Sequence, residues 1–307
     1  MSSIVIAGVV TNILSVVGIV ITNKYITEVD GFHFMVFLSF LHFAFTTLGT
    51  RVMLWMGLFT YQPAPLSGIL PVAAGSLLSV AFMNLNLSYN SVGFYQISKL
   101  ACIPFTLIVQ YVAYKLTVPR TVQLTLIPIT FGVGYATVYD LSINPVGLAF
   151  ATCAVVATAL AQIFTNTYQK SLGCDALQLL YHTSPLITLG MLVMCAFFDD
   201  LHAFAHYSYQ PDCVFRISLS CFFALGVNVS NYLVLGKTSP LTYQVLGHMK
   251  TVLILVLGFT VFNKPVDVRN VIGIVIAMVG VVAYTEVRRR DSTPGLPVAQ
   301  SSDRLEK

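Results

Sequence analysis

Long apolar runs, interrupted by short polar turns, follow one another along nearly the whole chain. Residues 52–98 contain no Lys, Arg, Asp or Glu, and residues 141–169 form a second uncharged run. Each run is at least as long as the roughly 20 residues that one helical crossing of a bilayer needs. The pattern therefore predicts successive membrane-spanning helices joined by short loops.

Turn residues and charges divide this pattern into ten predicted helices and a tail. The helices cover residues 4–22, 33–56, 67–88, 92–114, 121–139, 145–166, 177–197, 215–236, 241–262 and 270–287. A longer polar segment, 198–214, separates the seventh helix from the eighth. Residues 288–307 are polar and contain Pro and Gly, which predicts a disordered cytosolic tail.

Composition supports an all-α integral membrane protein. The chain is 56% hydrophobic and 9% charged, and its mean hydropathy is +0.81. Its net charge of +4 comes mostly from basic residues scattered at segment ends, which does not favour nucleic acid as a partner. The six cysteines contain no CxxC pair and are interpreted as small core residues. The sequence indicates no metal and no cofactor.

Basic residues predict the orientation in the membrane. If the N-terminus is cytosolic, the cytosolic side carries Arg51, Lys115, Arg120, Lys170, Lys237 and Arg288–Arg290, and the far side carries Lys24, Arg216, Lys264 and Arg269. Because cytoplasmic loops carry the excess of Lys and Arg, both termini are predicted to be cytosolic.

An internal repeat divides the chain into two halves. An offset of 148 pairs Tyr95 with Tyr243 and Gly132 with Gly280, and an offset of 143 aligns residues 22–25 with 165–168. We therefore predict a first five-helix repeat at 1–140 and a second at 141–287. Since five is odd, the second repeat enters the membrane inverted, which is typical of transporters that bind substrate near the midplane where the halves meet.

Two lysines, Lys99 and Lys250, lie inside otherwise uncharged parts of the fourth and ninth predicted helices. A lysine at mid-membrane depth costs roughly 2.5–3.5 kcal/mol on insertion scales. No carboxylate lies near either lysine in the sequence, so we predict that their partner is an anionic ligand. The alternative is that both side chains snorkel to the interface.

Aromatic and small residues accompany these lysines. Tyr95 lies four residues before Lys99, and Tyr243 and Gly247 share a helical face with Lys250. A tyrosine ring can stack on a nucleobase while a lysine neutralises phosphate, although a packing role is the alternative for each tyrosine. Neutral hydrogen-bonding groups within the spans come from Asn23, Asn84, Asn86, Asn166, Asn228 and Asn231.

Three segments resemble a known family. They read NSVGFYQISKLACIPFT, QIFTNTYQKSLGCDALQLLYHTSP and KTSPLTYQVLGHMKTVLILVLGF. They are similar to plant-type nucleotide-sugar transporters of the triose-phosphate translocator group, within the drug/metabolite transporter superfamily. The resemblance implies ten helices, cytosolic termini, and exchange of a nucleotide sugar for the matching nucleoside monophosphate across the Golgi membrane, with the endoplasmic reticulum as the alternative location.

The resemblance also implies a substrate class. Lys250-Thr251 matches the Lys-Thr pair of UDP-galactose and UDP-rhamnose transporters, whereas triose-phosphate translocators have Lys-Arg there. Lys99 matches their phosphate-binding lysine. Segments 180–183 and 246–250 depart from the guanine-reading patterns of GDP-mannose transporters, which favours a UDP-sugar. The candidate substrate-binding residues are Asn23, Tyr95, Lys99, Tyr181, His182, Thr183, Asn231, Tyr243, Gln244, Gly247, Lys250 and Thr251.

Antiport is the mechanism that the charges favour. Proton- or sodium-driven carriers usually hold their ion with membrane-embedded carboxylates, and none is embedded here. We therefore expect a UDP-sugar/UMP antiporter, with a sugar-phosphate/phosphate exchanger as the alternative. An integral-membrane glycosyltransferase is disfavoured, because the only adjacent acidic pair, Asp199-Asp200, lies in a loop. The carried sugar stays open, with galactose, rhamnose, xylose and arabinose as the alternatives, and so does the formation of a homodimer. Membrane lipid is the expected surroundings.

Overall fold

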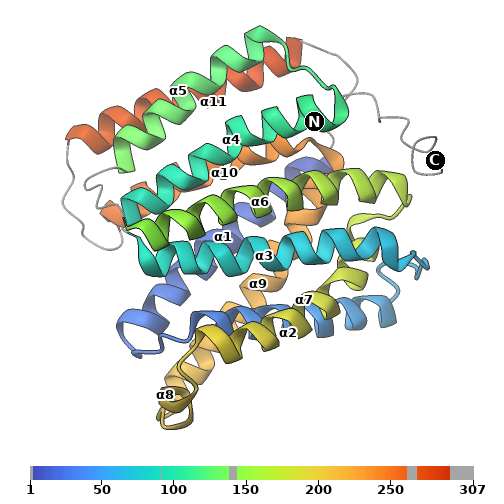
Figure 1. The fold of residues 1–307 in the computed structure, drawn as a ribbon, viewed down its shortest axis with the longest axis vertical. Coiled ribbons are helices and arrows are strands. Elements are labelled where there is room, and N and C mark those ends of the chain that lie inside the picture. Colours follow the sequence, from blue (N-terminus) through green and yellow to red (C-terminus); the bar gives the residue numbers. More distant parts are fainter. Residues whose placement is uncertain (1–2, 91, 138–143, 261–267, 291–307) are drawn as a thin grey trace. The chain divides into compact units, whose positions relative to one another are not determined.

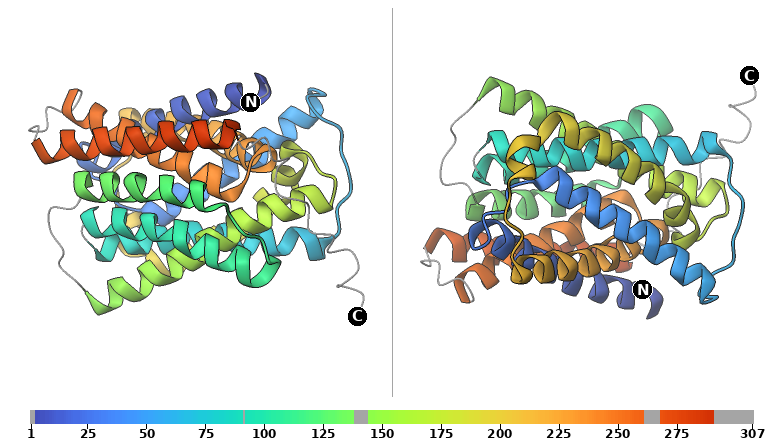
Figure 2. Two further views of the ribbon diagram at one scale, coloured as in Figure 1. Left: turned by 90° about the horizontal axis from the view of Figure 1, so that it is seen from above. Right: turned by 90° about the horizontal axis from the view of Figure 1, so that it is seen from below.

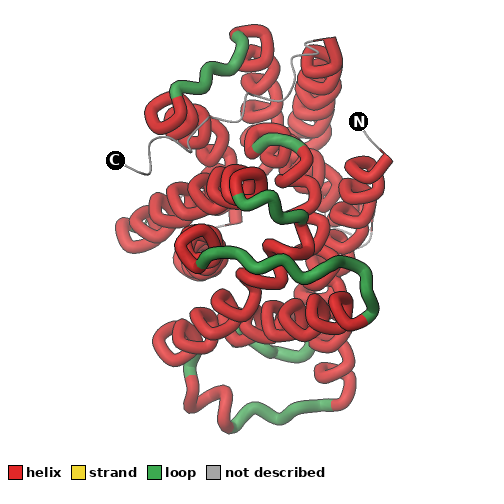
Figure 3. The backbone as a smooth tube through the Cα atoms, turned by 90° about the vertical axis from the view of Figure 1, so that its right-hand side faces the viewer, coloured by secondary structure: helices red, strands yellow, loops and turns green. Residues whose placement is uncertain are grey.

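The computed structural model describes residues 3–90, 92–137, 144–260 and 268–290. Within these ranges the regular elements are all helices (Figure 3), which confirms the all-α prediction. The helices are α1 (Ser3–Glu28), α2 (Met35–Trp55), α3 (Leu66–Tyr89), α4 (Val92–Tyr114), α5 (Arg120–Thr137), α6 (Pro145–Ser171), α7 (Ala176–Phe198), α8 (Leu201–Ala205), α9 (Pro211–Lys237), α10 (Pro240–Thr260) and α11 (Val268–Arg290).

A helix lies at each of the ten predicted positions. Six described helices, α1, α2, α3, α6, α7 and α9, are long and apolar enough to cross a membrane by length and composition. The protein is thus a multi-pass membrane protein. Residues 288–290, predicted as the start of the tail, form the end of α11 instead, and the rest of the tail, 291–307, lies outside the described residues.

Several helices continue beyond their predicted ends, and polar side-chain contacts accompany the extension of α1 and α6. The first prediction ended before Asn23 and Lys24, but α1 continues to Glu28, where Lys24 forms an ion pair with Glu28 at 3.5 Å. In α6, Lys170 donates to Asn166 Oδ1 at 3.2 Å in the same i,i+4 geometry. Polar residues at these points extend the helices because their side chains interact one turn apart.

The polar segment before α9 contains the short helix α8, which had been predicted only as a loop. Asp200 caps this helix by accepting from the backbone N–H groups of His202 and Ala203, each at 3.0 Å. Asp199 accepts from the backbone N–H of Phe37 at 2.6 Å, in the first turn of α2. Both carboxylates therefore accept hydrogen bonds from backbone N–H groups at helix N-termini, where negative charge is favourable.

The chain divides into two compact units. Unit 1 comprises residues 1–84 and 160–237, and unit 2 comprises residues 85–159 and 238–307. The boundaries fall inside α3 and α6, and each unit takes helices from both predicted repeats. The division into repeats at 1–140 and 141–287 stays a prediction.

Unit 1 is built on two helix pairs. Helix α1 lies along α9, and α2 lies along α7 (Figures 1 and 2). Val36 and Phe43 of α2 pack with the buried Ile187 and Met191 of α7. These apolar contacts form the core of the pair.

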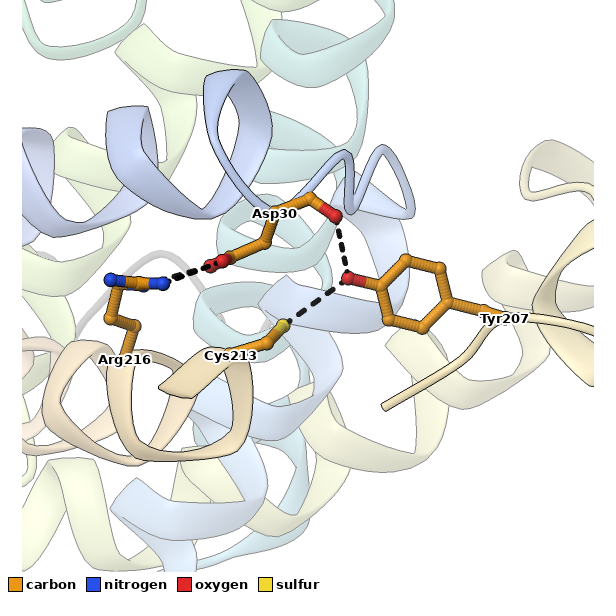
Figure 4. A network of polar contacts seen from close by, with 4 residues as sticks. All are labelled: Asp30, Tyr207, Cys213 and Arg216. Carbon is orange, nitrogen blue, oxygen red and sulfur yellow. Dashed lines mark hydrogen bonds and ion pairs between the residues drawn. The ribbon is translucent and has the colours of Figure 1, made fainter. Parts of the chain in front are cut away.

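Polar contacts join the ends of α1 and α9 in unit 1 (Figure 4). Arg216 donates two hydrogen bonds to the Asp30 carboxylate, at 2.7 and 2.9 Å. Tyr207 donates from its hydroxyl to the backbone carbonyl of Asp30 at 2.8 Å and lies 3.4 Å from Cys213 Sγ. The turn after α1 is thereby fixed to the segment that starts α9.

Unit 2 is also built on helix pairs. Helices α5 and α11 lie side by side (Figures 1 and 2), and α4 lies next to α10. A Cβ atom at Gly132 would lie 2.4 Å from the backbone nitrogen of Ala277. Only glycine permits this approach, as is common where membrane helices pack through small residues.

Candidate anion-binding site

Helices α4 and α10 of unit 2 carry the two lysines. Helix α10 begins with Pro240, whose missing N–H is not needed at the first helical position. Ser239 precedes it, and its Oγ accepts from the backbone N–H of Thr242 at 3.2 Å. This local sequence fixes the start of α10 and hence the register in which Lys250 follows.

Each lysine lies over a tyrosine ring of its own helix. The Nζ of Lys99 is 5.1 Å from the centroid of Tyr95, and the Nζ of Lys250 is 5.2 Å from that of Tyr243. A cation over an aromatic face at this distance is attracted by the ring quadrupole. The spacings of four and seven residues therefore give two equivalent tyrosine–lysine pairs.

The two lysines belong to one electropositive cluster. Lys99 interacts electrostatically with Lys250, and both interact with the buried His248 of α10. None of the twelve acidic residues of the chain lies in α4 or α10. The geometry therefore suits a ligand that carries negative charge.

Three more candidates lie near this cluster in α10. Gln244 is buried and donates to Thr106 Oγ1 of α4 at 2.6 Å. Thr251 is also buried and donates to the carbonyl of Gly247 at 3.3 Å. A Cβ atom at Gly247 would meet nothing within 4 Å. Gly247 thus borders open space, whereas Gln244 and Thr251 bond within the unit.

The remaining candidates lie in unit 1, and Tyr181 forms an aromatic cluster there. Its ring centroid is 6.0 Å from that of Phe59 and 6.0 Å from that of Tyr61. The guanidinium of Arg51 lies 5.2 Å from the same centroid. Tyr181 is only half-buried, so the cluster can offer an aromatic surface near a cation.

His182 and Thr183 differ in their surroundings. The Nε2 atom of His182 lies 2.8 Å from the carbonyl of Gln62, and the residue is half-buried. Thr183 is fully buried, and its hydroxyl lies 2.9 Å from the hydroxyl of Tyr232. Thr183 therefore bonds to the interior of unit 1.

The two asparagines also bond within unit 1. Asn231 accepts from Asn12 at 2.7 Å. Asn23 accepts from the hydroxyl of Ser220, which also lies 2.8 Å from Nε2 of the buried His42. These contacts join α1, α2 and α9, so both asparagines contribute to helix packing.

Sequence reasoning missed three residues at these places. His248 lies two positions before Lys250, and a histidine so close to a buried lysine was the available signal. Arg51 had been considered only for the orientation in the membrane, and Tyr61 had not been considered. Their contacts with Tyr181 join distant parts of the chain, so no local sequence pattern indicated them.

Metal binding has no support in the described residues. Among them, no group of three or more His, Cys, Asp or Glu could hold a metal ion. Within the same part of the chain, Cys153 is exposed, and the other five cysteines are buried and free.

Comparison with known proteins identifies the family. The model of the Triose-phosphate Transporter family matches residues 9–285. The chain belongs to this family. UDP-xylose transporter 3 of Arabidopsis thaliana is 38% identical over 304 residues, which cover 95% of this chain and 85% of that protein. UDP-rhamnose/UDP-galactose transporter 1 of Arabidopsis thaliana is 36% identical over 294 residues, which cover 92% of this chain and 85% of that protein.

A solved crystal structure shows the same fold. It superposes with a TM-score of 0.70 over 95% of this chain and 100% of the other, at 12% sequence identity. At this identity the likeness concerns the fold alone. The family match confirms the resemblance seen in the three segments and identifies this member of the Triose-phosphate Transporter family as a transporter rather than an enzyme.

Proposed function

We propose that this protein exchanges a UDP-sugar for UMP across the Golgi membrane. The observation that carries the proposal is the cluster of Lys99 and Lys250 on two adjacent helices that contain no acidic residue. The names of the relatives supply the substrate class, a UDP-sugar. A phosphate group with about two negative charges complements two lysines.

Strict exchange follows from the same charges. An empty site would keep two ammonium groups close together in a medium of low dielectric constant without the anionic ligand, which is unfavourable for the inward–outward transition. A bound nucleotide on either side neutralises them. The carrier therefore moves loaded, by alternating access of two inverted five-helix repeats with both termini in the cytosol.

Tyr181 is the candidate for contact with the base. Its half-buried ring, with Arg51 nearby, is suited to stacking on uracil, and His182 adds a polar group beside it. Thr183 contributes by holding the seventh helix in place through Tyr232.

Reconstitution into liposomes tests the proposal. Vesicles preloaded with UMP should take up UDP-xylose, UDP-galactose or UDP-rhamnose, each offered in turn, far faster than empty vesicles do. Preloading with inorganic phosphate should give no acceleration. Equal uptake by empty vesicles would exclude strict antiport.

A sugar-phosphate/phosphate exchanger is the second candidate, since a pair of lysines can bind any phosphate. Uptake driven by inorganic phosphate and not by UMP would establish it. A sugar-phosphate exchanger would have a second cation directly after Lys250. This chain has Thr251 there, which favours the nucleotide exchanger.

A further inference from the structure

His248 is a buried polar residue with an unused nitrogen. It lies in α10, and its side chain is only 7% exposed. Among the residues that the structure describes, its Nε2 atom has no hydrogen-bond partner. Most buried polar side-chain atoms have at least one partner, so an imidazole nitrogen left alone calls for an explanation.

The surroundings of His248 are cationic. Lys99 comes from the neighbouring helix α4, Lys250 lies two residues further along α10, and both interact electrostatically with the imidazole. Both lysines are half-buried. Because His248 lies one turn after Gln244, which donates to Thr106 of α4, its side chain is on the face of α10 toward the helix that carries Lys99.

We propose that His248 is a third ligand contact, whose Nε2–H donates a hydrogen bond to a phosphate oxygen held between Lys99 and Lys250. The inference rests on the proposed function and names a residue that recognises the phosphate of its ligand. Hydrogen bonds to charged acceptors are stronger than neutral ones, and two neighbouring cations favour an anionic acceptor for this donor.

Two amide replacements separate this role from packing. A glutamine amide extends about as far as Nε2, whereas an asparagine amide ends near the position of Nδ1. His248→Gln therefore keeps a donor at the relevant place, and His248→Asn and His248→Leu lose it. Gln110→Leu is the matched control, because Gln110 of α4 is also buried with an unpartnered Oε1 among the described residues, but lies eleven positions from Lys99.

Binding to the purified full-length protein is measured by the shift in melting temperature during titration with UMP. We expect His248→Leu and His248→Asn to weaken UMP binding by about tenfold or more, and His248→Gln to stay within about threefold of the wild type. Gln110→Leu should bind as the wild type does. The melting temperature without UMP shows whether each variant is folded.

The outcomes distinguish the two proposals. Wild-type binding by both His248→Leu and His248→Asn overturns the role of His248 and leaves UDP-sugar/UMP exchange intact. Equal losses in His248→Gln and His248→Asn overturn it as well, so the test holds where the leucine variant does not fold. A wild-type protein that binds inorganic phosphate but no UMP overturns the proposed function itself.

Discussion

Lys250 is the residue on which the proposed site depends most. Lys250→Ala should abolish exchange and leave the melting temperature unchanged, because the phosphate loses a charge-assisted partner in a cavity of low dielectric constant. Lys250→Arg should restore exchange only in part, since a planar guanidinium does not replace a compact ammonium. Uptake of UDP-sugar into UMP-loaded liposomes is the measurement.

Lys237→Ala is the control for this experiment. Lys237 is exposed in the last turn of α9, so its removal should leave exchange unchanged. Lys99→Ala should also lower exchange, because Lys99 shares the cluster. Normal uptake by Lys250→Ala at limiting substrate would remove Lys250 from the site.

We expect the aromatic face of Tyr95, rather than its hydroxyl, to contribute to UMP binding. Tyr95→Phe keeps an aromatic face under the Lys99 ammonium, whereas Tyr95→Leu removes it. A cation–π contact contributes roughly 0.5–1 kcal/mol at an exposed site, so the leucine variant should lose about two- to fivefold in UMP affinity. The phenylalanine variant should remain near the wild type. Loss in both variants would instead assign the role to the hydroxyl.

Sequence spacing predicted the structural surroundings of some candidate residues but not of others. The contact of Tyr95 with Lys99 follows from helix geometry, which puts residues four apart on one face. The burial of Thr183 does not follow from spacing, because it depends on a contact with Tyr232 of α9, which is distant in the sequence. His248 was missed for the same reason, since a missing hydrogen-bond partner exists only in three dimensions.

At the scale of helices, the contact between α5 and α11 should be intolerant of added volume. In Gly132→Ala, the new methyl group would lie 2.4 Å from the nitrogen of Ala277 and 2.6 Å from the oxygen of Gly273. Backbone atoms cannot move aside as side chains can, so this substitution should cost about 1–3 kcal/mol and lower the melting temperature.

Gly134→Ala is the control on the same helix. Its methyl group would lie 3.5 Å from Leu100 Cδ1, which is an ordinary contact. This variant should melt close to the wild type, and the slightly higher helix propensity of alanine favours it. Similar melting of the two variants would show that α5 and α11 do not pack as described.

The ion pair between Asp30 and Arg216 should stabilise unit 1 through its burial. The Asp30 side chain is only 7% exposed, so Arg216→Leu leaves a buried carboxylate without its bidentate partner. We expect this variant to melt at a lower temperature than the double variant Asp30→Leu with Arg216→Leu. A melting temperature of Arg216→Leu equal to that of the wild type would contradict this role.

The exposed pair of Arg290 and Glu286 provides the comparison. Its side chains are 77% and 36% exposed, and surface ion pairs contribute little. Arg290→Gln should therefore leave the melting temperature unchanged.

The helices themselves were predictable because each one needs only its own apolar length. Their long-range caps were not. Asp199 accepts from the backbone N–H of Phe37, a residue 162 positions earlier, and no local pattern connects the two. For the same reason the acidic pair had been considered only as a possible catalytic motif, although both carboxylates cap helices.

At the scale of the molecule, the repeat in the sequence and the compact units divide the chain differently. The repeat compares residues 1–140 with 141–287, but each unit takes helices from both. The offset of 148 that matches Tyr95 with Tyr243 pairs Lys99 with Gly247 and Lys250 with Cys102. The two lysines are therefore about one helical turn out of register, an asymmetry that suits the nucleotide proposed as the ligand, which has no two-fold symmetry.

The orientation in the membrane is testable with two single substitutions that create glycosylation sites. His206→Asn completes a sequon with Ser208 in the exposed segment before α9, which is predicted to face the lumen. Lys115→Asn completes one with Thr117 between α4 and α5, on the predicted cytosolic side. Lys115 has a φ of 54°, a conformation that asparagine adopts more readily than most residues, so this control should fold.

Because the excess of basic residues lies on the side of Lys115, we expect glycosylation of the His206→Asn variant alone after expression in eukaryotic cells. The measurement is a glycosidase-sensitive shift on a gel. Asn86 and Asn228 of the native sequons lie within α3 and α9, so the wild type should show no shift. Glycosylation of the Lys115→Asn variant alone would place both termini on the luminal side and reverse the direction assigned to the exchange.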